Sequence, residues 1–460
     1  MSRRRSVKPR MGLETLKVLT LPLVGVVVVA LGIVVGPATP APTGPRQVDI
    51  AASVAACPIG GGLTASAGQV DAGTSSEVST TTGEDTARTD LDPDVWTPAA
   101  ATGDSATVRQ DGTGGGVAYA AGRLASGNGL VVSACPRVTD ETWYLGAGTT
   151  ARHASSLVLT NVADVVGSVD VELWGPAGPI DAVGETGIVV EPGETRTVSI
   201  SDLAVGADEV ALRVVRTRGA VTSALVDTST SVLAGSEVLP STGEPATETV
   251  LPGVAASGTR TLLLANPGST AATASVRQAG AESDFVPEGL DAVAVPAGSV
   301  VSVPLPAASG VDATAFRISS DRPVLSTVRV TASAQDFAYA TSSPAWTGPV
   351  VVPVDTGAGP LRPVLQLLAD DATAQVTVEA FDASMTSVGS TTVEVGSTVL
   401  GQVDLADPAA FGSPEIAYVV LSADEPVHGT AVYRVENLLS LLGLEEAPVD
   451  ALGPDVRPGF

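Results

Sequence analysis

Few residues in this sequence have side chains suited to catalysis. The 460-residue chain contains two histidines, His153 and His428, and two cysteines, Cys57 and Cys135. A Ser-His-Asp triad needs an imidazole bonded to both partners, yet neither histidine stands in a hydrolase context and the G-x-S-x-G motif is absent. Structural zinc takes about four Cys or His ligands, and only two imidazoles remain if the cysteines pair. We therefore expect structural or surface histidines, with no catalytic residue, metal or cofactor.

The carboxylates and tryptophans suggest further chemistry. Glycosidases need only two carboxylates at the right separation, but the chain has few of the aromatic residues that sugar-processing clefts use: 4 Trp, 5 Tyr and 6 Phe. Trp143, Trp174 and Trp346 lie near Gly or Pro at predicted strand ends. Packing in a core or at a junction is the favoured interpretation. The alternative is a polysaccharide-binding cleft between repeats.

Two short motifs resemble functional signatures. Asp90, Asp92 and Asp94 alternate as in a calcium loop, but the residues that follow lack the glycine that an EF-hand needs. A solvated acidic loop is favoured, with calcium binding as the alternative. The LPSTG sequence at residues 239–243 fits a sorting motif, but more than two hundred residues follow it. We interpret it as a turn between repeats.

The N-terminal segment predicts export. Six basic residues precede Val18–Gly36, a run of 19 residues without charge. At about 1.5 Å per residue this run nearly spans a ~30 Å hydrocarbon core, and the basic flank belongs on the cytoplasmic side. We favour an uncleaved signal anchor in the cell membrane, with the C-terminal region extracytoplasmic. A protein secreted after signal-peptide cleavage is the alternative. Because an exported pair of cysteines favours a disulfide, we expect one between Cys57 and Cys135.

The charge distribution agrees with export. The chain carries 24 Lys and Arg against 50 Asp and Glu, a net charge of −26. Both lysines lie before Val18, so the part beyond Gly36 contains none. A strongly acidic surface keeps an exported protein soluble and repels nucleic acid and anionic lipid. We therefore expect no nucleic-acid partner.

Residues 261–330 set the pattern for the folded region. Apolar residues alternate with small or polar ones, as at Leu262 and Leu264, which is the signal of half-buried strands. Residues 157–161 match residues 262–266 at an offset of 105, and residues 365–370 follow at a similar distance. A period near 100 residues is a domain repeat, too long for a solenoid unit. We predict an all-β fold of about three tandem immunoglobulin-like β-sandwich repeats.

The predicted organisation has eight segments. They are a basic cytoplasmic segment (1–17), the transmembrane helix (18–36), a Pro-rich spacer (37–47), a divergent N-terminal β unit (48–141), three β-sandwich repeats (142–246, 247–348 and 349–435), and a C-terminal short helix with a tail (436–460).

Two stretches within this plan carry predictions of their own. A Ser/Thr/Gly/Asp-rich stretch at about 65–94 predicts a long exposed loop or local disorder. The sequence ENLLSLLGLEE at 436–446 predicts a short capping helix. Each junction between repeats carries a strand of its own, so we expect packed neighbours. These would form either a rod or a compact pseudo-threefold body.

Three stretches also carry a family resemblance: ACPRVTDETWYLGAGTTARHASSLVLTNV, VELWGPAGPI and TRTLLLANPG. From Ser53 to the C-terminus the chain resembles the DUF5719 group, an actinobacterial family of secreted or membrane-anchored proteins of unknown function. The resemblance implies a cell-envelope setting in a high-GC Gram-positive bacterium and brings no catalytic residues.

The functional expectation follows from these features together. We expect a non-catalytic, membrane-anchored scaffold or interaction module of the cell envelope. Its partners would be the membrane, through residues 18–36, and an envelope protein or cell-wall glycan. The alternative is a cell-wall polysaccharide-binding protein that uses a cleft between repeats.

Overall fold

The described part of the chain is all β. The computed structural model describes residues 47–49, 52–58, 62–69, 75–82, 85–91, 95–99, 105–111, 115–124, 129–181, 184–230, 235–256, 258–280, 283–307, 313–333, 336–356, 361–411 and 415–452. Within these ranges the only helices are α2 (Ile200–Leu203) and α3 (Pro408–Phe411), of four residues each. The predicted all-β class is confirmed.

Residues 49–450 form one compact unit. It contains four successive two-sheet sandwiches. A separate two-stranded sheet pairs β1 (Gln47–Asp49) with β36 (Asp450–Leu452). The first sandwich comprises β2 (Ala52–Pro58), β3 (Leu63–Gln69), β4 (Ser75–Thr82), β5 (Asp85–Leu91), β6 (Thr97–Ala99), β7 (Ser105–Asp111), β8 (Gly116–Leu124) and β9 (Gly129–Ala134). The second comprises β10 (Glu141–Ala147), β11 (Thr149–Thr150), β12 (His153–Asn161), β13 (Gly167–Gly175), β14 (Gly178–Ile180), β15 (Ile188–Val190), β16 (Thr195–Ser199), β17 (Val210–Arg218), β18 (Val221–Ser229) and β19 (Gly235–Leu239).

The second half of the unit continues the pattern. The third sandwich comprises β20 (Ala246–Ala255), β21 (Thr259–Asn266), β22 (Ala272–Ala279), β23 (Asp284–Phe285), β24 (Val293–Val295), β25 (Ser299–Pro304), β26 (Ala313–Ser333) and β27 (Asp336–Thr341). The fourth comprises β28 (Val350–Pro353), β29 (Val364–Ala369), β30 (Ala374–Phe381), β31 (Ser387–Val395), β32 (Gly401–Asp404), β33 (Tyr418–Ala423), β34 (Val427–Val435) and β35 (Leu438–Gly443).

All four sandwiches share one strand order. In the fourth, one sheet runs β28-β33-β30-β31 and the other β32-β29-β34-β35, and the first has the same order as β2-β7-β4-β5 and β6-β3-β8-β9. The third differs in that the long strand β26 passes from one sheet to the other, pairing with β20 and β22 and then with β21 and β27. The N-terminal unit, which the sequence sets apart as divergent, is therefore a fourth copy of the same architecture.

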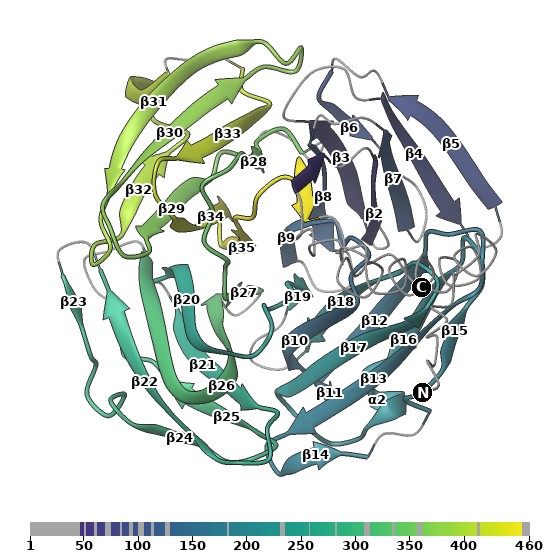
Figure 1. Ribbon diagram of the computed structural model, residues 1–460, viewed down its shortest axis with the longest axis vertical. Helices are drawn as coiled ribbons and strands as arrows, with labels where there is room; N and C mark the ends of the chain where they lie inside the picture. The colour runs from purple at the N-terminus through teal and green to yellow at the C-terminus, as the bar shows by residue number, and fades with distance from the viewer. Residues whose placement is uncertain are drawn as a thin grey trace, which may run out of the picture. The chain divides into compact units, whose positions relative to one another are not determined.

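The last strands of the four sandwiches meet at the centre of the unit. Strand β9 contacts β19, β19 contacts β27, β27 contacts β35, and β35 contacts β9. Figure 1 shows these strands in the middle, with the remaining strands around them. The sandwiches therefore form a closed circle of four. The expected rod and the expected pseudo-threefold body are both wrong, because the sequence repeat had revealed only three of the four members.

The stretch at about 65–94 is not a long loop. Strands β4 and β5 pair over their full length, and β4 also pairs with β7. The prediction of a long loop or local disorder is wrong for these strands. Low hydrophobicity suggested disorder, but the stretch is rich in threonine, a β-branched residue that suits strands.

The predicted helix at 436–446 is also wrong, because this stretch forms β35. Leu439 and Leu441 are buried in the core of the third sandwich, whereas Leu442 and Leu444 are buried in that of the fourth. A strand that is buried on both faces has no polar alternation, so its sequence cannot be distinguished from a buried helix by periodicity. The spacing of the leucines therefore suggested a helix. Glu436, with a φ of 55°, lies in the tight turn that joins β34 to β35.

The alternation of apolar residues in the sequence repeat correctly predicts which leucines are buried in the cores. Leu262 and Leu264 are fully buried in the third sandwich, and the equivalent leucines at 157, 159, 365 and 367 are fully buried in theirs. Leu263, on the opposite face of β21, is buried too, because it packs against Trp143 and Leu145 of the second sandwich. The sandwiches are thus packed neighbours, as predicted.

The predicted membrane span lies outside the described residues. Among the described residues, no helix is long and apolar enough to cross a membrane. Anchoring by residues 18–36 stays a prediction.

Candidate functional site

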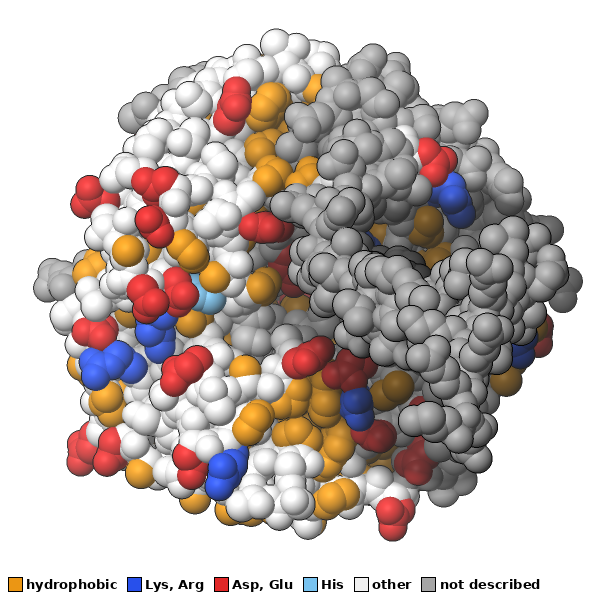
Figure 2. Space-filling model, viewed as in Figure 1, with side chains coloured by type: hydrophobic (Ala, Val, Ile, Leu, Met, Phe, Trp, Pro, Cys, Tyr) orange, Lys and Arg blue, Asp and Glu red, His pale blue; other side chains and the backbone are white. Residues whose placement is uncertain are grey.

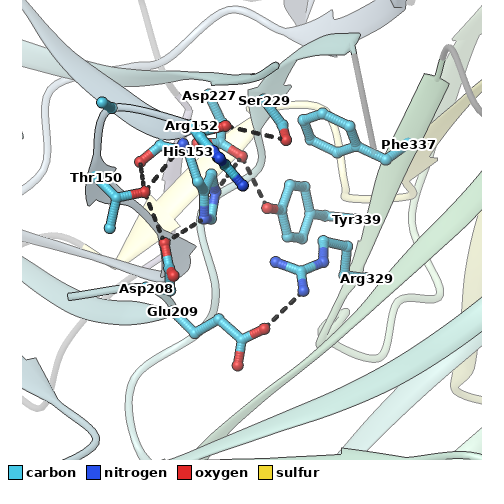
Figure 3. A pocket seen from close by; sticks show the side chains of 11 residues that line it. Thr150, Arg152, His153, Asp208, Glu209, Asp227, Ser229, Arg329, Phe337 and Tyr339 are labelled. Carbon is cyan, nitrogen blue, oxygen red and sulfur yellow. Dashed lines mark hydrogen bonds and ion pairs between the residues drawn. The ribbon is translucent and has the colours of Figure 1, made fainter. Parts of the chain in front are cut away.

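A buried polar cluster joins the second sandwich to the third. Asp227, on β18, is fully buried, and its carboxylate accepts three hydrogen bonds. The donors are the Ser155 hydroxyl at 2.6 Å, the Tyr339 hydroxyl at 2.8 Å and His153 Nε2 at 3.0 Å. Ser155 and His153 lie on the neighbouring strand β12, whereas Tyr339 comes from β27 of the third sandwich. Figure 3 shows His153 and Tyr339 on either side of Asp227. One carboxylate therefore ties two sandwiches together.

The imidazole of His153 lies between two carboxylates. Its Nε2 faces Asp227, and its Nδ1 lies 3.6 Å from Oδ1 of the exposed Asp208. Burial opposes a positive charge on the ring, but the hydrogen bond and the charge of Asp227, helped by Asp208, outweigh burial and raise the pKa of His153. The ring is therefore held as a cation more readily than a free histidine.

A cavity of about 530 Å³ lies beside this cluster. Arg329 enters it from β26 and forms an ion pair with Glu209 at 2.6 Å. Glu209 has a positive φ of 63°, and its second oxygen accepts a hydrogen bond from Ser302 of the third sandwich. The cavity thus contains paired charges of both signs, and those pairs again cross the junction.

This geometry does not build a nucleophile. A catalytic triad needs a hydroxyl on one ring nitrogen and an acid on the other, but both nitrogens of His153 face acids. The Ser155 hydroxyl donates to Asp227 and accepts from the backbone N–H of Gly148 at 2.8 Å. The hydroxyl and the imidazole are therefore both bonded to Asp227, and these contacts are part of the junction.

The other histidine lies at the junction of the third and fourth sandwiches. His428 Nδ1 donates to the Ser343 carbonyl at 2.7 Å, so Nε2 faces Asp370 Oδ1 at 3.4 Å. Arg317 lies 3.4 Å from the same oxygen and also donates to the Asp370 carbonyl at 2.7 Å. Burial lowers the pKa of His428. These groups line a cavity of about 700 Å³. Each histidine therefore borders a cavity at a junction, and a structural role for both stays a prediction.

The turn at this second junction lacks the asparagine of the equivalent turns in the second and third sandwiches. At the equivalent turns, the Asn161 and Asn266 side chains close the loop: the Asn266 amide donates to the carbonyls of Thr270 and Val295 at 2.8 and 3.2 Å, and Asn161 makes the same pair of bonds. In the fourth sandwich the equivalent position is Ala369, which pairs with Val427 as Asn161 pairs with Val221, and alanine has no amide to donate. The carboxylate of the next residue, Asp370, lies beside Arg317 of the third sandwich.

The three predicted tryptophans do not form one site. Trp143 and Trp174 stack with ring centroids 5.3 Å apart, and the guanidinium of Arg213 lies 5.3 Å from the Trp143 ring centroid. This pair borders a cavity of about 380 Å³, whose other wall is the turn at Pro267 of the third sandwich. Trp346 is buried in the core of the fourth sandwich. Only the pair therefore lies at a cleft between repeats.

The remaining predicted residues are placed as follows. Cys57 and Cys135 form a disulfide that closes the first sandwich. Asp90 lies on β5 opposite Glu77, whereas Asp92 and Asp94 lie outside the described residues, so calcium binding there stays a prediction. Within the described ranges, no group of three or more His, Cys, Asp or Glu side chains could hold a metal ion. On the face drawn in Figure 2, the acidic side chains are scattered and do not gather in one patch.

Sequence reasoning missed most of the buried polar residues. Asp227 and Tyr339 are 112 residues apart, and no local motif links them. Trp96 was also missed: it stacks on Tyr418 of the fourth sandwich with ring centroids 4.8 Å apart, and its indole donates to the Asp355 carbonyl at 2.8 Å. The available signal was an acidic residue inside a strand-like run, as at Asp227.

The comparison with known families bears on most of the chain. No curated protein and no solved structure matches it. A family of unknown function, DUF5719, matches residues 94–405, a span that begins within the first sandwich, before β6, and ends in the fourth, after β32. The residues that carried the resemblance, from Ala134 to Gly268, lie inside this span. The chain therefore belongs to the DUF5719 family of unknown function.

Proposed function

We propose that this protein is a non-catalytic scaffold of the cell envelope, anchored in the membrane by residues 18–36, with its sandwiches extracytoplasmic. The observation that carries the proposal is that the Asp227 carboxylate accepts hydrogen bonds from two sandwiches. Its donors come from two sandwiches and include His153 and Tyr339, side chains well suited to acid–base chemistry. Because these groups hold sandwich to sandwich, they serve the rigidity that a scaffold requires.

We further infer that the units are variants of the immunoglobulin-like sandwich. In that fold the second strand pairs with the fifth and the third with the sixth. The fourth sandwich has both pairings, β29 with β32 and β30 with β33. It differs in that the first strand, β28, lies beside the sixth, the fourth, β31, beside the third, and the seventh, β34, beside the second. The inference therefore rests on the two shared pairings.

The test of the scaffold proposal separates tethering from catalysis. In the native host, residues 1–36 are replaced by a cleavable signal peptide in one strain and by an unrelated transmembrane anchor in a matched control strain. We expect loss of function in the first strain and retention in the second, because anchoring raises the effective concentration of membrane-bound partners. A released form that fully replaces the anchored protein would contradict tethering. Turnover of cell-wall material by the purified protein would contradict the non-catalytic proposal.

A second candidate function is binding of cell-wall polysaccharide, which the stacked pair Trp143 and Trp174 favours. Trp174 is only partly buried and borders the cavity beside Pro267. An aromatic face exposed at a cleft can stack on the apolar face of a sugar ring. Co-sedimentation with purified cell wall should weaken on Trp174→Ala and persist on Trp174→Phe, which keeps an aromatic ring. Equal binding by both variants and the wild type would exclude this site.

A further inference from the structure

A buried acid without a partner lies at the centre of the compact unit. Glu237 is on β19, one of the four central strands (Figure 1), and is 3% exposed. One carboxyl oxygen, Oε1, accepts the adjacent Val238 N–H at 3.0 Å, and the other, Oε2, has no hydrogen-bond partner. Among the described residues, Glu237 has no ion-pair partner. A bare carboxylate at such a position would cost several kcal/mol.

The nearest ionisable groups make a negative charge on Glu237 less favourable still. Asp227 lies directly opposite Glu237 in the β18–β19 pair. Asp336, at the start of β27, is also fully buried and repels a charge on Glu237. Burial, then the charge of Asp336 and that of Asp227, raise the pKa of Glu237 well above its ordinary value, opposed only by the Val238 N–H.

The other elements packed on β19 supply no compensating cation. Strands β9 and β35 contain no ionisable residue. On β10, the Tyr144 hydroxyl bonds to Ser223, and Glu141 is paired with Arg213. The cations nearest to Asp227 are already engaged: His153 with Asp227 itself, and Arg329 with Glu209.

Asp336 differs from Glu237 in its hydrogen bonds. Its carboxylate accepts the backbone N–H groups of Phe337 at 3.0 Å and Leu439 at 2.7 Å, and a third from Leu130. These donors belong to three of the four central strands. Burial raises the pKa of Asp336 to about 7, while the three N–H groups favour its charged form. Of the two acids, Asp336 is therefore the one built to carry the charge, and Glu237 the one built to keep a proton.

We propose that Glu237 is held as a neutral carboxylic acid and that closure of the four sandwiches around it takes up one proton, so that acid conditions tighten the body and alkaline conditions loosen it. Packing of the central strands β19, β27 and β35 would then depend on the proton that Glu237 carries. This inference is independent of the scaffold proposal, since it concerns how the body stays closed and not what it binds.

The sign of the pH effect follows from proton linkage. An unfolded glutamate loses its proton near pH 4.3, as a typical reference value, whereas folded Glu237 retains it well above that pH. Between the two values the folded state binds one proton more than the unfolded state. Stability is therefore lost as the pH rises, by about a tenfold change in the folding equilibrium constant per pH unit for each such proton.

The experiment compares the full chain with Glu237→Gln, which has the same shape and no proton to lose. Urea unfolding is measured at several pH values between about 5 and 8. Asp336 and the histidines contribute equally to both proteins, so the difference isolates Glu237. We expect the slope of log K against pH to be about one unit shallower for Glu237→Gln over this window. The exposed Glu425→Gln is the matched control and should keep the wild-type slope.

A second measurement does not depend on the variant folding. The infrared spectrum of the folded wild type at pH 9, where Asp336 with its pKa of about 7 is ionised, should contain the carbonyl stretch of a protonated carboxyl group, and unfolding at the same pH should remove it. Coincident pH slopes for wild type and Glu237→Gln would overturn the proposal. So would a folded wild type with no protonated carboxyl signal at pH 9.

Discussion

Replacing Asp227 by asparagine tests whether its carboxylate holds the second and third sandwiches together. Asparagine has nearly the same shape but only one neutral acceptor oxygen, and its NH₂ group must then face a hydrogen-bond donor. The three donors now on Asp227 are His153 Nε2, the Ser155 hydroxyl and the Tyr339 hydroxyl. At least one of them loses its acceptor, and His153 loses the anion that supports its charge.

The expected cost can be worked from these contacts. A hydrogen bond to a charged group contributes about 1.5–3 kcal/mol, and removing one partner of a buried ion pair costs about 3–5 kcal/mol. The two ranges are not added, because they describe the same contacts and because the asparagine oxygen still accepts some of the hydrogen bonds. We expect Asp227→Asn to lower the free energy of unfolding by about 3–5 kcal/mol at pH 5.5.

The loss should also depend on pH. The pKa of His153 is raised in the folded protein, so its contribution is fully present below its unfolded pKa of about 6.5 and is lost as the pH rises through the folded value. The gap between wild type and variant should therefore narrow toward pH 9. It should not close, because the bonds from Ser155 and Tyr339 do not titrate in this range.

The assay is urea unfolding followed by tryptophan fluorescence at pH 5.5 and pH 9. Both proteins are made in the Glu237→Gln background, so that the neighbouring acid cannot respond to the lost charge. Asp208→Asn is the matched control, since its carboxylate is 62% exposed and should contribute less than about 1 kcal/mol. A cost below about 1 kcal/mol for Asp227→Asn, or a gap that does not change with pH, would refute this account of the junction.

Three further outcomes are expected. Replacing Cys57 and Cys135 together by serine should cost about 4–5 kcal/mol, an upper figure from the loop-closure entropy of the 78-residue separation; free thiols in the denatured, unreduced protein would contradict the disulfide. Gly129→Ala should destabilise the centre by about 1–3 kcal/mol, because its Cβ would lie 1.7 Å from the Ser236 carbonyl oxygen on β19; wild-type stability would show that β9 and β19 do not approach so closely. N-terminal sequencing of the mature protein should show no cleavage, and a start at residues 41–44 would establish a signal peptide.

The cores could be predicted because they depend on local alternation. Leu262 and Leu264 on β21, like their equivalents in the second and fourth sandwiches, point into one face and repeat at a constant offset. The turn after them could also be predicted, since the side-chain amide of Asn266 donates only to carbonyls within 29 residues of itself. Where the stabilising contacts are close in sequence, the sequence pattern and the structure agree.

The circle of four could not be predicted from the same pattern. The first sandwich shares the strand order but not the leucine and turn residues that marked the other three. At the centre, β35 is buried on both faces, so the alternation that identifies a strand is absent there. A strand that packs against a neighbouring sandwich as well as its own core is apolar on both faces. It therefore lacks the alternation of apolar and polar residues from which strands are predicted.

The polar contacts at the junctions were hidden for a related reason. Asp227, Glu237 and Asp336 each stand as a single acid within a short strand-like run. The groups from other sandwiches that bond to Asp227 and Asp336 lie far away in the chain. From the sequence, a single acidic residue in such a run is predicted to lie on the exposed face of a strand. Only the closed arrangement shows that these three carboxylates are buried, and that two of them bridge sandwiches.

The differences among the junctions explain how similar sandwiches assemble in one order. The second and third are joined by the Asp227–Tyr339 bond, and the third and fourth by Arg317 on the Asp370 turn. The fourth and first are joined by aromatic stacking of Trp96 on Tyr418. A donor placed against the wrong neighbour would be buried without its acceptor, at a cost of about 1–3 kcal/mol. Shared strands and turns thus build the sandwiches, whereas residues that depart from the repeat determine which sandwich packs against which.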